Sequence, residues 1–176
     1  AIASLLLLLP LHTVQAESIL IRAGTLIDVD AGQVLLDQAI LLEGDRIVSV
    51  QPYRSGIAGG RRELDWTAYT VAPGFMDMHT HLAGDIQNYN VEAYLKATPE
   101  DDVLAGAANA RKTLMAGFTT VRDVGSYNGF VDVSLRDAIA QGWVSGPRMF
   151  TAGAYVTVPG GGGEVGGPDA RVELLG

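Results

Sequence analysis

The feature that most constrains the fold is a change of sequence pattern near residue 70. Residues 18–70 consist of short apolar runs separated by turn residues, which predicts β-structure. Beyond this point apolar strands alternate with segments of helical periodicity, and this alternation favours a parallel sheet with helical connections. The fold class we predict is therefore α/β.

Turn and capping residues set the limits of the expected elements. A hairpin is predicted around Gly44, and Thr98 followed by Pro99 is typical of a helix start. Acidic residues in the first turn complement the helix dipole, and Gly117 is a natural C-terminal cap. The further elements expected are strands over 118–124 and 148–156 and a helix over 130–141. Two and a half strand–helix units after a β segment match the start of a (β/α)8 barrel.

Two histidines lie two residues apart within residues 73–82, in the sequence Pro-Gly-Phe-Met-Asp-Met-His-Thr-His-Leu. On an extended strand, His79 and His81 project from the same face and form a partial ligand set for a divalent metal such as zinc. The alternative is a chance pair in a sheet. The pair follows a strand entered through Pro73-Gly74, and the chain has three histidines, so we favour the metal site.

Three further side chains are candidates for substrate contact or for support of a metal ligand. Asp77 shares the expected face of the histidines and either orients an imidazole or acts as a structural acceptor. Asp123 ends the second expected strand, and its alternative roles are a pair with Arg122 or an acceptor for loop amides. Tyr155 lies at the end of the third strand, where its position alone allows substrate contact.

A glycine run follows the third expected strand and would lie on the active-site side of a barrel. Its members are Gly160, Gly161, Gly162 and Gly163. Such backbone can approach a ligand closely or move as a lid, and the alternative is a flexible linker. It is not a phosphate loop, because no Gly-Lys-Ser/Thr follows.

The motif from Pro73 to Leu82 resembles the first-strand motif of the amidohydrolase superfamily of metal-dependent hydrolases. The segments 117–125 and 146–148 are similar to the group of imidazolonepropionase-like and Xaa-Pro dipeptidase-like enzymes. The resemblance covers about residues 18–165. It implies a TIM barrel preceded by half of a small β-sandwich, whose other half follows the barrel.

The resemblance also implies a ligand set. His79 and His81 would be metal ligands of a centre that is binuclear in the complete protein, with zinc as the expected metal. The other ligands in the family are a carboxylated lysine, two further histidines and an eighth-strand aspartate that shuttles protons. These are expected beyond Gly176, because Lys96 and Lys112 do not lie on a later strand. The catalytic residues are therefore unknown from this chain, and we expect it to be inactive by itself.

The ends of the sequence predict an exported and incomplete chain. Residues 1–16 resemble a secretory signal peptide that lacks its basic start, with a cleavage site before Glu17, and the alternative is a buried element of the domain. A barrel needs about 250 residues. The domains expected are a truncated leader over 1–16, the sandwich half over 17–70 and the incomplete barrel over 71–176. We expect a periplasmic or secreted protein.

Composition narrows the partners. The net charge of −8 argues against nucleic acid and against an anionic membrane surface once the leader is removed. Zero cysteines exclude disulfides, thiolate ligands and a cysteine nucleophile. The partner expected is a small molecule or dipeptide, and self-association into a homo-oligomer is compatible with this.

The function we expect is metal-dependent hydrolysis of a carbon–nitrogen bond in an amide or peptide, with a dipeptidase-like substrate first. One alternative keeps the superfamily but changes the reaction to deamination or deacetylation. Another is a non-catalytic chain that binds metal or a partner, with the exposed edge of the sandwich half as its pairing surface.

Overall fold

The computed structural model describes residues 17–84, 96–158 and 161. The chain forms two compact units, with the boundary in the sequence between Pro73 and Gly74, and each unit is described by itself. In the described part of the chain, no helix combines the length and apolar character that crossing a membrane requires.

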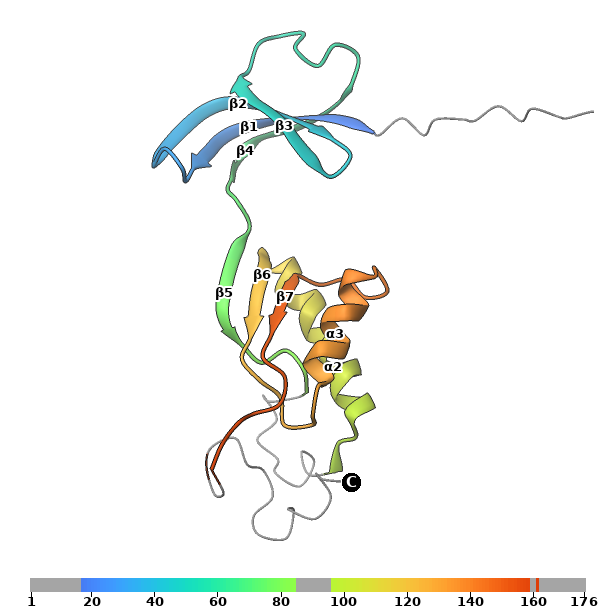
Figure 1. The fold of residues 1–176 in the computed structure, drawn as a ribbon. Helices are drawn as coiled ribbons and strands as arrows, with labels where there is room; N and C mark the ends of the chain where they lie inside the picture. Colours follow the sequence, from blue (N-terminus) through green and yellow to red (C-terminus); the bar gives the residue numbers. More distant parts are fainter. Residues whose placement is uncertain (1–16, 85–95, 159–160, 162–176) are drawn as a thin grey trace, which may run out of the picture. The chain divides into compact units, whose positions relative to one another are not determined.

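The first unit is a four-stranded sheet with the strand order β3-β2-β1-β4 (Figure 1). Its strands are β1 (Ser18–Asp28), β2 (Gln33–Glu43), β3 (Arg46–Pro52) and β4 (Arg62–Val71). β2 pairs antiparallel with β1 and β3, whereas β4 runs parallel to β1. The hairpin predicted around Gly44 is confirmed, since this residue turns the chain between β2 and β3 with a φ of 60°. Ile21, Ala23 and Ile40 form the buried core of the sheet.

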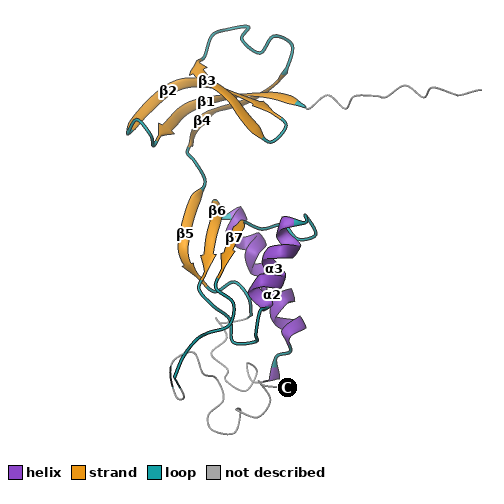
Figure 2. Cartoon of the chain, viewed as in Figure 1, coloured by secondary structure: helices purple, strands orange, loops and turns teal. Residues whose placement is uncertain are grey.

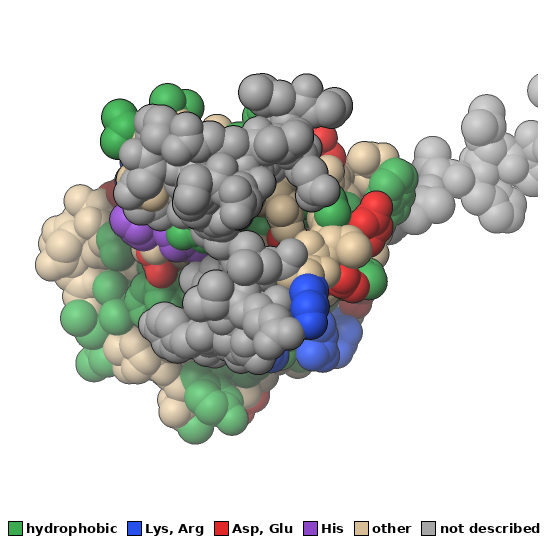
Figure 3. Space-filling view, turned by 90° about the horizontal axis from the view of Figure 1, so that it is seen from below, with side chains coloured by type: hydrophobic (Ala, Val, Ile, Leu, Met, Phe, Trp, Pro, Cys, Tyr) green, Lys and Arg blue, Asp and Glu red, His purple; other side chains and the backbone are tan. Residues whose placement is uncertain are grey.

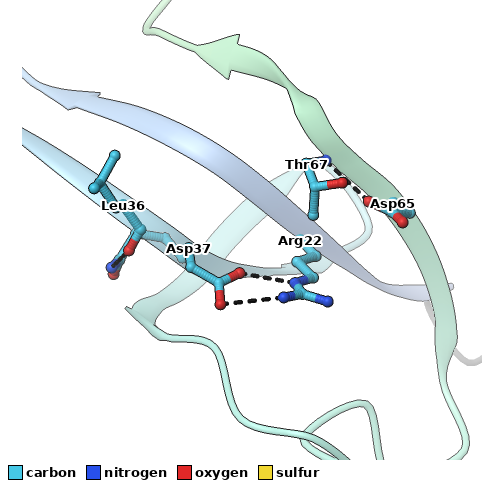
Figure 4. Close-up of polar contacts among 6 residues, drawn as sticks. Arg22, Leu36, Asp37, Asp65 and Thr67 are labelled. Atoms are coloured by element: carbon cyan, nitrogen blue, oxygen red, sulfur yellow. Dashed lines mark hydrogen bonds and ion pairs between the residues drawn. The ribbon is translucent and has the colours of Figure 1, made fainter.

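A local irregularity in this sheet is held by an ion pair. Asp37 has a φ of 48°, which is unusual for a residue other than glycine. Its carboxylate accepts hydrogen bonds from Arg22 Nε at 2.7 Å and Nη2 at 3.2 Å (Figure 4). The Arg22 guanidinium also lies 4.0 Å from the centre of the Tyr53 ring. The pair therefore joins β1 to β2 at the point where the pairing of β1 with β4 shifts register, between Ala23 and Thr25.

The second unit is a parallel sheet, as the alternation of strands and helices predicts. β5 (Phe75–Thr80), β6 (Phe118–Asp123) and β7 (Arg148–Thr151) lie in the order β5-β6-β7. The helices α2 (Pro99–Met115) and α3 (Val131–Ala140) pack together on one side of this sheet (Figure 2). The buried core between helices and sheet consists of Leu82, Ala110, Val121, Leu135 and Met149.

The ends of α2 follow the predicted signals. The Thr98 hydroxyl accepts a hydrogen bond from Asp101 N at 3.2 Å, and the Asp101 carboxylate accepts one from Thr98 N at 3.0 Å. This reciprocal capping box satisfies two amides that the helix itself leaves unpaired. Gly117 follows the helix with a φ of 96°, a value that favours glycine.

The third strand differs from the prediction because it ends at Thr151 and not at Val156. Gly153 has a φ of 82°, and its amide donates to the Asp132 carboxylate at 2.8 Å. This hydrogen bond turns the chain out of the strand ladder, which resumes only as an isolated bridge between Ser126 and Ala154. The predicted leader over 1–16 and the glycines Gly160, Gly162 and Gly163 lie outside the described residues.

Replacing Asp37 tests the ion pair in the first unit. The Arg22 hydrogen bond lowers the pKa of the Asp37 carboxyl, so the stabilisation by this pair is present above the ordinary pKa of about 3.9. It is lost as the pH falls through the lowered folded-state pKa. We expect Asp37→Asn to reduce the free energy of unfolding at pH 7 and to have a smaller effect at pH 3. Urea unfolding at both pH values measures it.

Asp45→Asn, in the exposed turn between β2 and β3, is the matched control for loss of one negative charge. An equal effect of Asp37→Asn at both pH values would contradict a role of the ion pair.

Replacing Thr98 tests the cap of α2. Thr98→Ala removes one side of the capping box, and we expect it to lower the free energy of unfolding by about 1 kcal/mol. Thr98→Ser keeps the hydroxyl and should stay within a few tenths of a kcal/mol of the native protein. Urea denaturation compares the three proteins, and equal stabilities of the alanine and serine variants would refute the role of the cap.

Candidate functional site

The two histidines of the motif lie together at the carboxyl end of β5. His79 is the next-to-last residue of the strand, and His81 follows its last residue, Thr80. The centroids of the two rings are 5.5 Å apart, and the rings are nearly perpendicular at 77°. Viewed from the carboxyl ends of the strands, histidine side chains are visible at the surface (Figure 3). Two imidazoles therefore meet at one surface position.

The inner nitrogen of His81 has two hydrogen-bond partners. Nδ1 lies 3.1 Å from the carbonyl oxygen of Gly125 and 2.8 Å from the hydroxyl of Tyr155. Nδ1 donates to the Gly125 carbonyl in the tautomer that carries the proton on Nδ1, and in that tautomer the Tyr155 hydroxyl oxygen is also an acceptor. In that tautomer Nε2 keeps its lone pair, which is the form a metal-ligating histidine needs.

Asp77 and Asp123 both accept hydrogen bonds from backbone amides. Asp77 is half-buried, and its carboxylate accepts a hydrogen bond from His79 N at 3.0 Å. Asp123 is fully buried, and it accepts from Leu82 N at 2.7 Å and from Gly125 N at 3.3 Å. Each carboxylate therefore acts as an acceptor for backbone amides, which is one of the roles that the sequence allowed for it.

The Asp123 contacts hold two backbone segments next to His81, one in the loop after β5 and one in the loop after β6. Leu82 follows His81 directly in the chain, and Gly125 supplies the carbonyl oxygen that meets the His81 ring. Burial raises the pKa of the Asp123 carboxyl, while the two amide hydrogen bonds oppose this effect. The carboxylate thus holds the loop after β5 and the loop after β6 together.

Tyr155 closes the site from the chain that follows β7. Its ring packs edge-on against Tyr127, with centroids 4.7 Å apart, and lies 6.0 Å from the ring of His81. Burial, followed by the nearby Tyr127 and the acids Asp123 and Asp132, raises the pKa of Tyr155 to about 12. The hydroxyl therefore keeps its proton at neutral pH and can serve as both donor and acceptor.

The remaining sequence candidates contribute less to this cluster. Gly161 is half-buried, and its amide donates to the carbonyl of Val158 at 2.8 Å. Among the described residues, no group of three or more histidine, cysteine, aspartate or glutamate side chains is arranged to hold a metal. His79 and His81 are therefore a candidate for part of a ligand set, since imidazole nitrogens are donors that suit zinc and similar divalent ions.

Sequence reasoning missed two polar residues behind the site, the buried Asp132 and the half-buried Asn109. Asp132 is fully buried and accepts from the amides of Gly153 and Val133, both at 2.8 Å. From α2, Asn109 donates to the carbonyl oxygens of Leu82 and Gly84, both at 3.1 Å. An aspartate in the first turn of a helix is usually attributed to the helix dipole, so its sequence position alone did not reveal this role. Asn109 within an apolar helix segment was a usable signal.

Comparison with known proteins finds a matching family model and several similar proteins. Residues 70–174 match the model described as "Amidohydrolase family". Ochratoxinase of Aspergillus niger is 29% identical over 161 residues, which are 87% of this chain and 32% of that protein. A 5-methylthioadenosine/S-adenosylhomocysteine deaminase of Thermococcus kodakarensis is 30% identical over 142 residues, covering 73% of this chain and 33% of its own.

The chain is also similar to solved structures of hydrolases. A Xaa-Pro dipeptidase with bound methionine in its active site is 35% identical, with a TM-score of 0.68 over 78% of this chain and 33% of that chain. Molinate hydrolase is 26% identical, with a TM-score of 0.65 over 80% of this chain and 30% of its own. The chain spans about a third of the length of these relatives.

Replacing Asp123 tests the clamp that its carboxylate forms with the amides of Leu82 and Gly125. Asparagine keeps one acceptor oxygen but turns an NH2 group toward one of the two amides, which leaves a buried donor unpaired. We expect Asp123→Asn to lower the free energy of unfolding by about 1–3 kcal/mol. Asp137→Asn, at an exposed carboxylate of α3, is the control in the same urea titration. Equal stabilities of the two variants would show that the clamp contributes nothing.

Proposed function

Since the chain belongs to the amidohydrolase family, we propose that it forms the amino-terminal part of a metal-dependent hydrolase that cleaves carbon–nitrogen bonds in amides or peptides. The observation that carries the proposal is the pair of adjacent imidazoles, with His81 Nδ1 held by the Gly125 carbonyl. That contact favours the tautomer whose Nε2 binds a metal. Zinc is the expected ion, in a binuclear centre of the complete protein.

The proposed fold is the start of a (β/α)8 barrel preceded by half of a small β-sandwich. The parallel order β5-β6-β7 with both helices on one side supports the barrel. Parallel sheets are normally covered on both faces, yet Met76, Met78 and Phe150 on this sheet are exposed. Further barrel strands would cover them. The antiparallel pairs of the first unit support the sandwich half.

The proposed substrate class is a dipeptide or a similar small amide. Similarity to a Xaa-Pro dipeptidase and to ochratoxinase supports this choice. The second candidate function is deamination, which the similarity to a 5-methylthioadenosine/S-adenosylhomocysteine deaminase supports. The two histidines serve both reactions, so direct assay of dipeptides against aminopurine nucleosides separates them.

The residues of this chain would prepare the metal position. A bound divalent metal supplies a Lewis acid and lowers the pKa of a water molecule. His79 and His81 would bind it through neutral imidazole nitrogens, and Asp123 would keep the two supporting loops in place. Tyr155 retains its proton and adds a neutral hydroxyl beside His81.

We also propose that the protein is exported, to the periplasm or outside the cell. The apolar run Leu5–Leu9 and the small residues before Glu17 support a leader. The net charge of −8 supports a small-molecule partner over nucleic acid.

Replacing the histidines tests the metal site. We expect His79→Ala and His81→Ala each to lower zinc content and dipeptide hydrolysis in the full-length protein, because each removes one imidazole ligand. Removal of metal with a chelator should abolish hydrolysis, and added zinc should restore it. Metal analysis by mass spectrometry and a dipeptide panel provide the measurements.

Met78→Leu is the matched control, since it changes the side chain between Asp77 and His79 at nearly constant volume and removes no imidazole. Full zinc content in both alanine variants would refute the proposed site.

A further inference from the structure

Tyr155 reaches the candidate metal ligand from a different part of the chain. Its hydroxyl lies 2.8 Å from Nδ1 of His81, although the two residues are 74 positions apart in the sequence. Gly125 O approaches the same nitrogen at 3.1 Å. Two oxygen atoms therefore restrain one edge of the His81 ring.

The position of the Tyr155 ring is fixed by its surroundings. The bridge between Ser126 and Ala154 aligns the residue before Tyr155 with the loop after β6. At Gly125, a Cβ atom would clash with Cε1 of Tyr155, so the absence of a side chain leaves room for the ring. Tyr127 packs edge-on against the same ring at 4.7 Å. These contacts belong to the ring and not to the hydroxyl.

We propose that Tyr155 is a positioning residue that, together with the Gly125 carbonyl, orients the His81 imidazole so that Nε2 faces the metal. This inference rests on the proposed metal site. With the proton on Nδ1, the Gly125 carbonyl and the Tyr155 hydroxyl oxygen both lie within reach as acceptors. The two contacts restrict rotation of the ring, which reduces the ordering that metal binding would otherwise require.

The test removes the hydroxyl and keeps the ring. Tyr155→Phe preserves the packing against Tyr127 and Gly125, so we expect an unchanged free energy of unfolding in the metal-free full-length protein. The zinc dissociation constant, measured by competition with a chromogenic chelator, should rise about tenfold. In metal-free protein the 15N resonance of His81 Nδ1 should shift, whereas the ring resonances of His79 should stay in place.

The matched control is Tyr69→Phe, which removes the hydroxyl of an exposed tyrosine in β4. It should change neither zinc affinity nor the His81 resonances. His81→Ala assigns the His81 resonances and tests the metal site itself.

The possible results separate the two proposals. If native protein binds zinc and Tyr155→Phe changes neither affinity nor the His81 Nδ1 resonance, the positioning role is overturned and the metal site stands. If Tyr155→Phe loses affinity together with stability, Tyr155 has a general packing role and the inference is also overturned. If native protein and His81→Ala bind zinc equally, the metal site and the positioning role both fail.

Discussion

The buried carboxylate of Asp123 accepts hydrogen bonds from the amides of Leu82 and Gly125, and the geometry of the candidate site depends on this pair of contacts. One amide belongs to the residue after His81, and the other to the residue whose carbonyl meets the His81 ring. A buried carboxylate is costly unless its oxygens are paired, so these bonds also stabilise the loops. The hydrogen bonds that Asp123 accepts therefore help to set the position of His81.

Polar side chains behind the site are likewise hydrogen-bonded to backbone groups. Asp132 accepts from Gly153 and Val133, and Asn109 binds the carbonyl oxygens of Leu82 and Gly84. Over the described residues, no buried side-chain nitrogen or oxygen lacks a hydrogen-bond partner. Each loop at the carboxyl ends of β5, β6 and β7 is therefore held by side chains from a helix or strand. These hydrogen bonds are the kind of support that holds the side chains of a binding site in place.

Local signals made much of the fold predictable. The hairpin at Gly44 and the capping residue Thr98 act within a few positions of themselves, so their effects are visible in the sequence. The end of β7 was not predictable in this way, because it depends on a hydrogen bond from Gly153 to Asp132, 21 positions earlier. The apolar character of the residues after Thr151 suggested a longer strand.

The candidate site divides along the same line. The spacing of His79 and His81 predicted that their rings lie on the same side of the strand, and the ring centroids are 5.5 Å apart. The sequence could not show which amides Asp123 accepts or that Tyr155 meets His81, since these contacts join residues 41 and 74 positions apart. Long-range contacts of this kind are set by the packing of whole elements.

The proposed function depends on the binding of a divalent metal by His79 and His81. X-ray absorption spectroscopy of the zinc-loaded full-length protein tests this most directly, because imidazole ligands give a characteristic outer-shell scattering. If both histidines are ligands, at least two imidazole nitrogens lie at about 2.0–2.1 Å from zinc, and replacing both histidines by alanine lowers the number of imidazole nitrogens per zinc. A zinc environment of oxygen ligands alone, or one that the double replacement leaves unchanged, would contradict it.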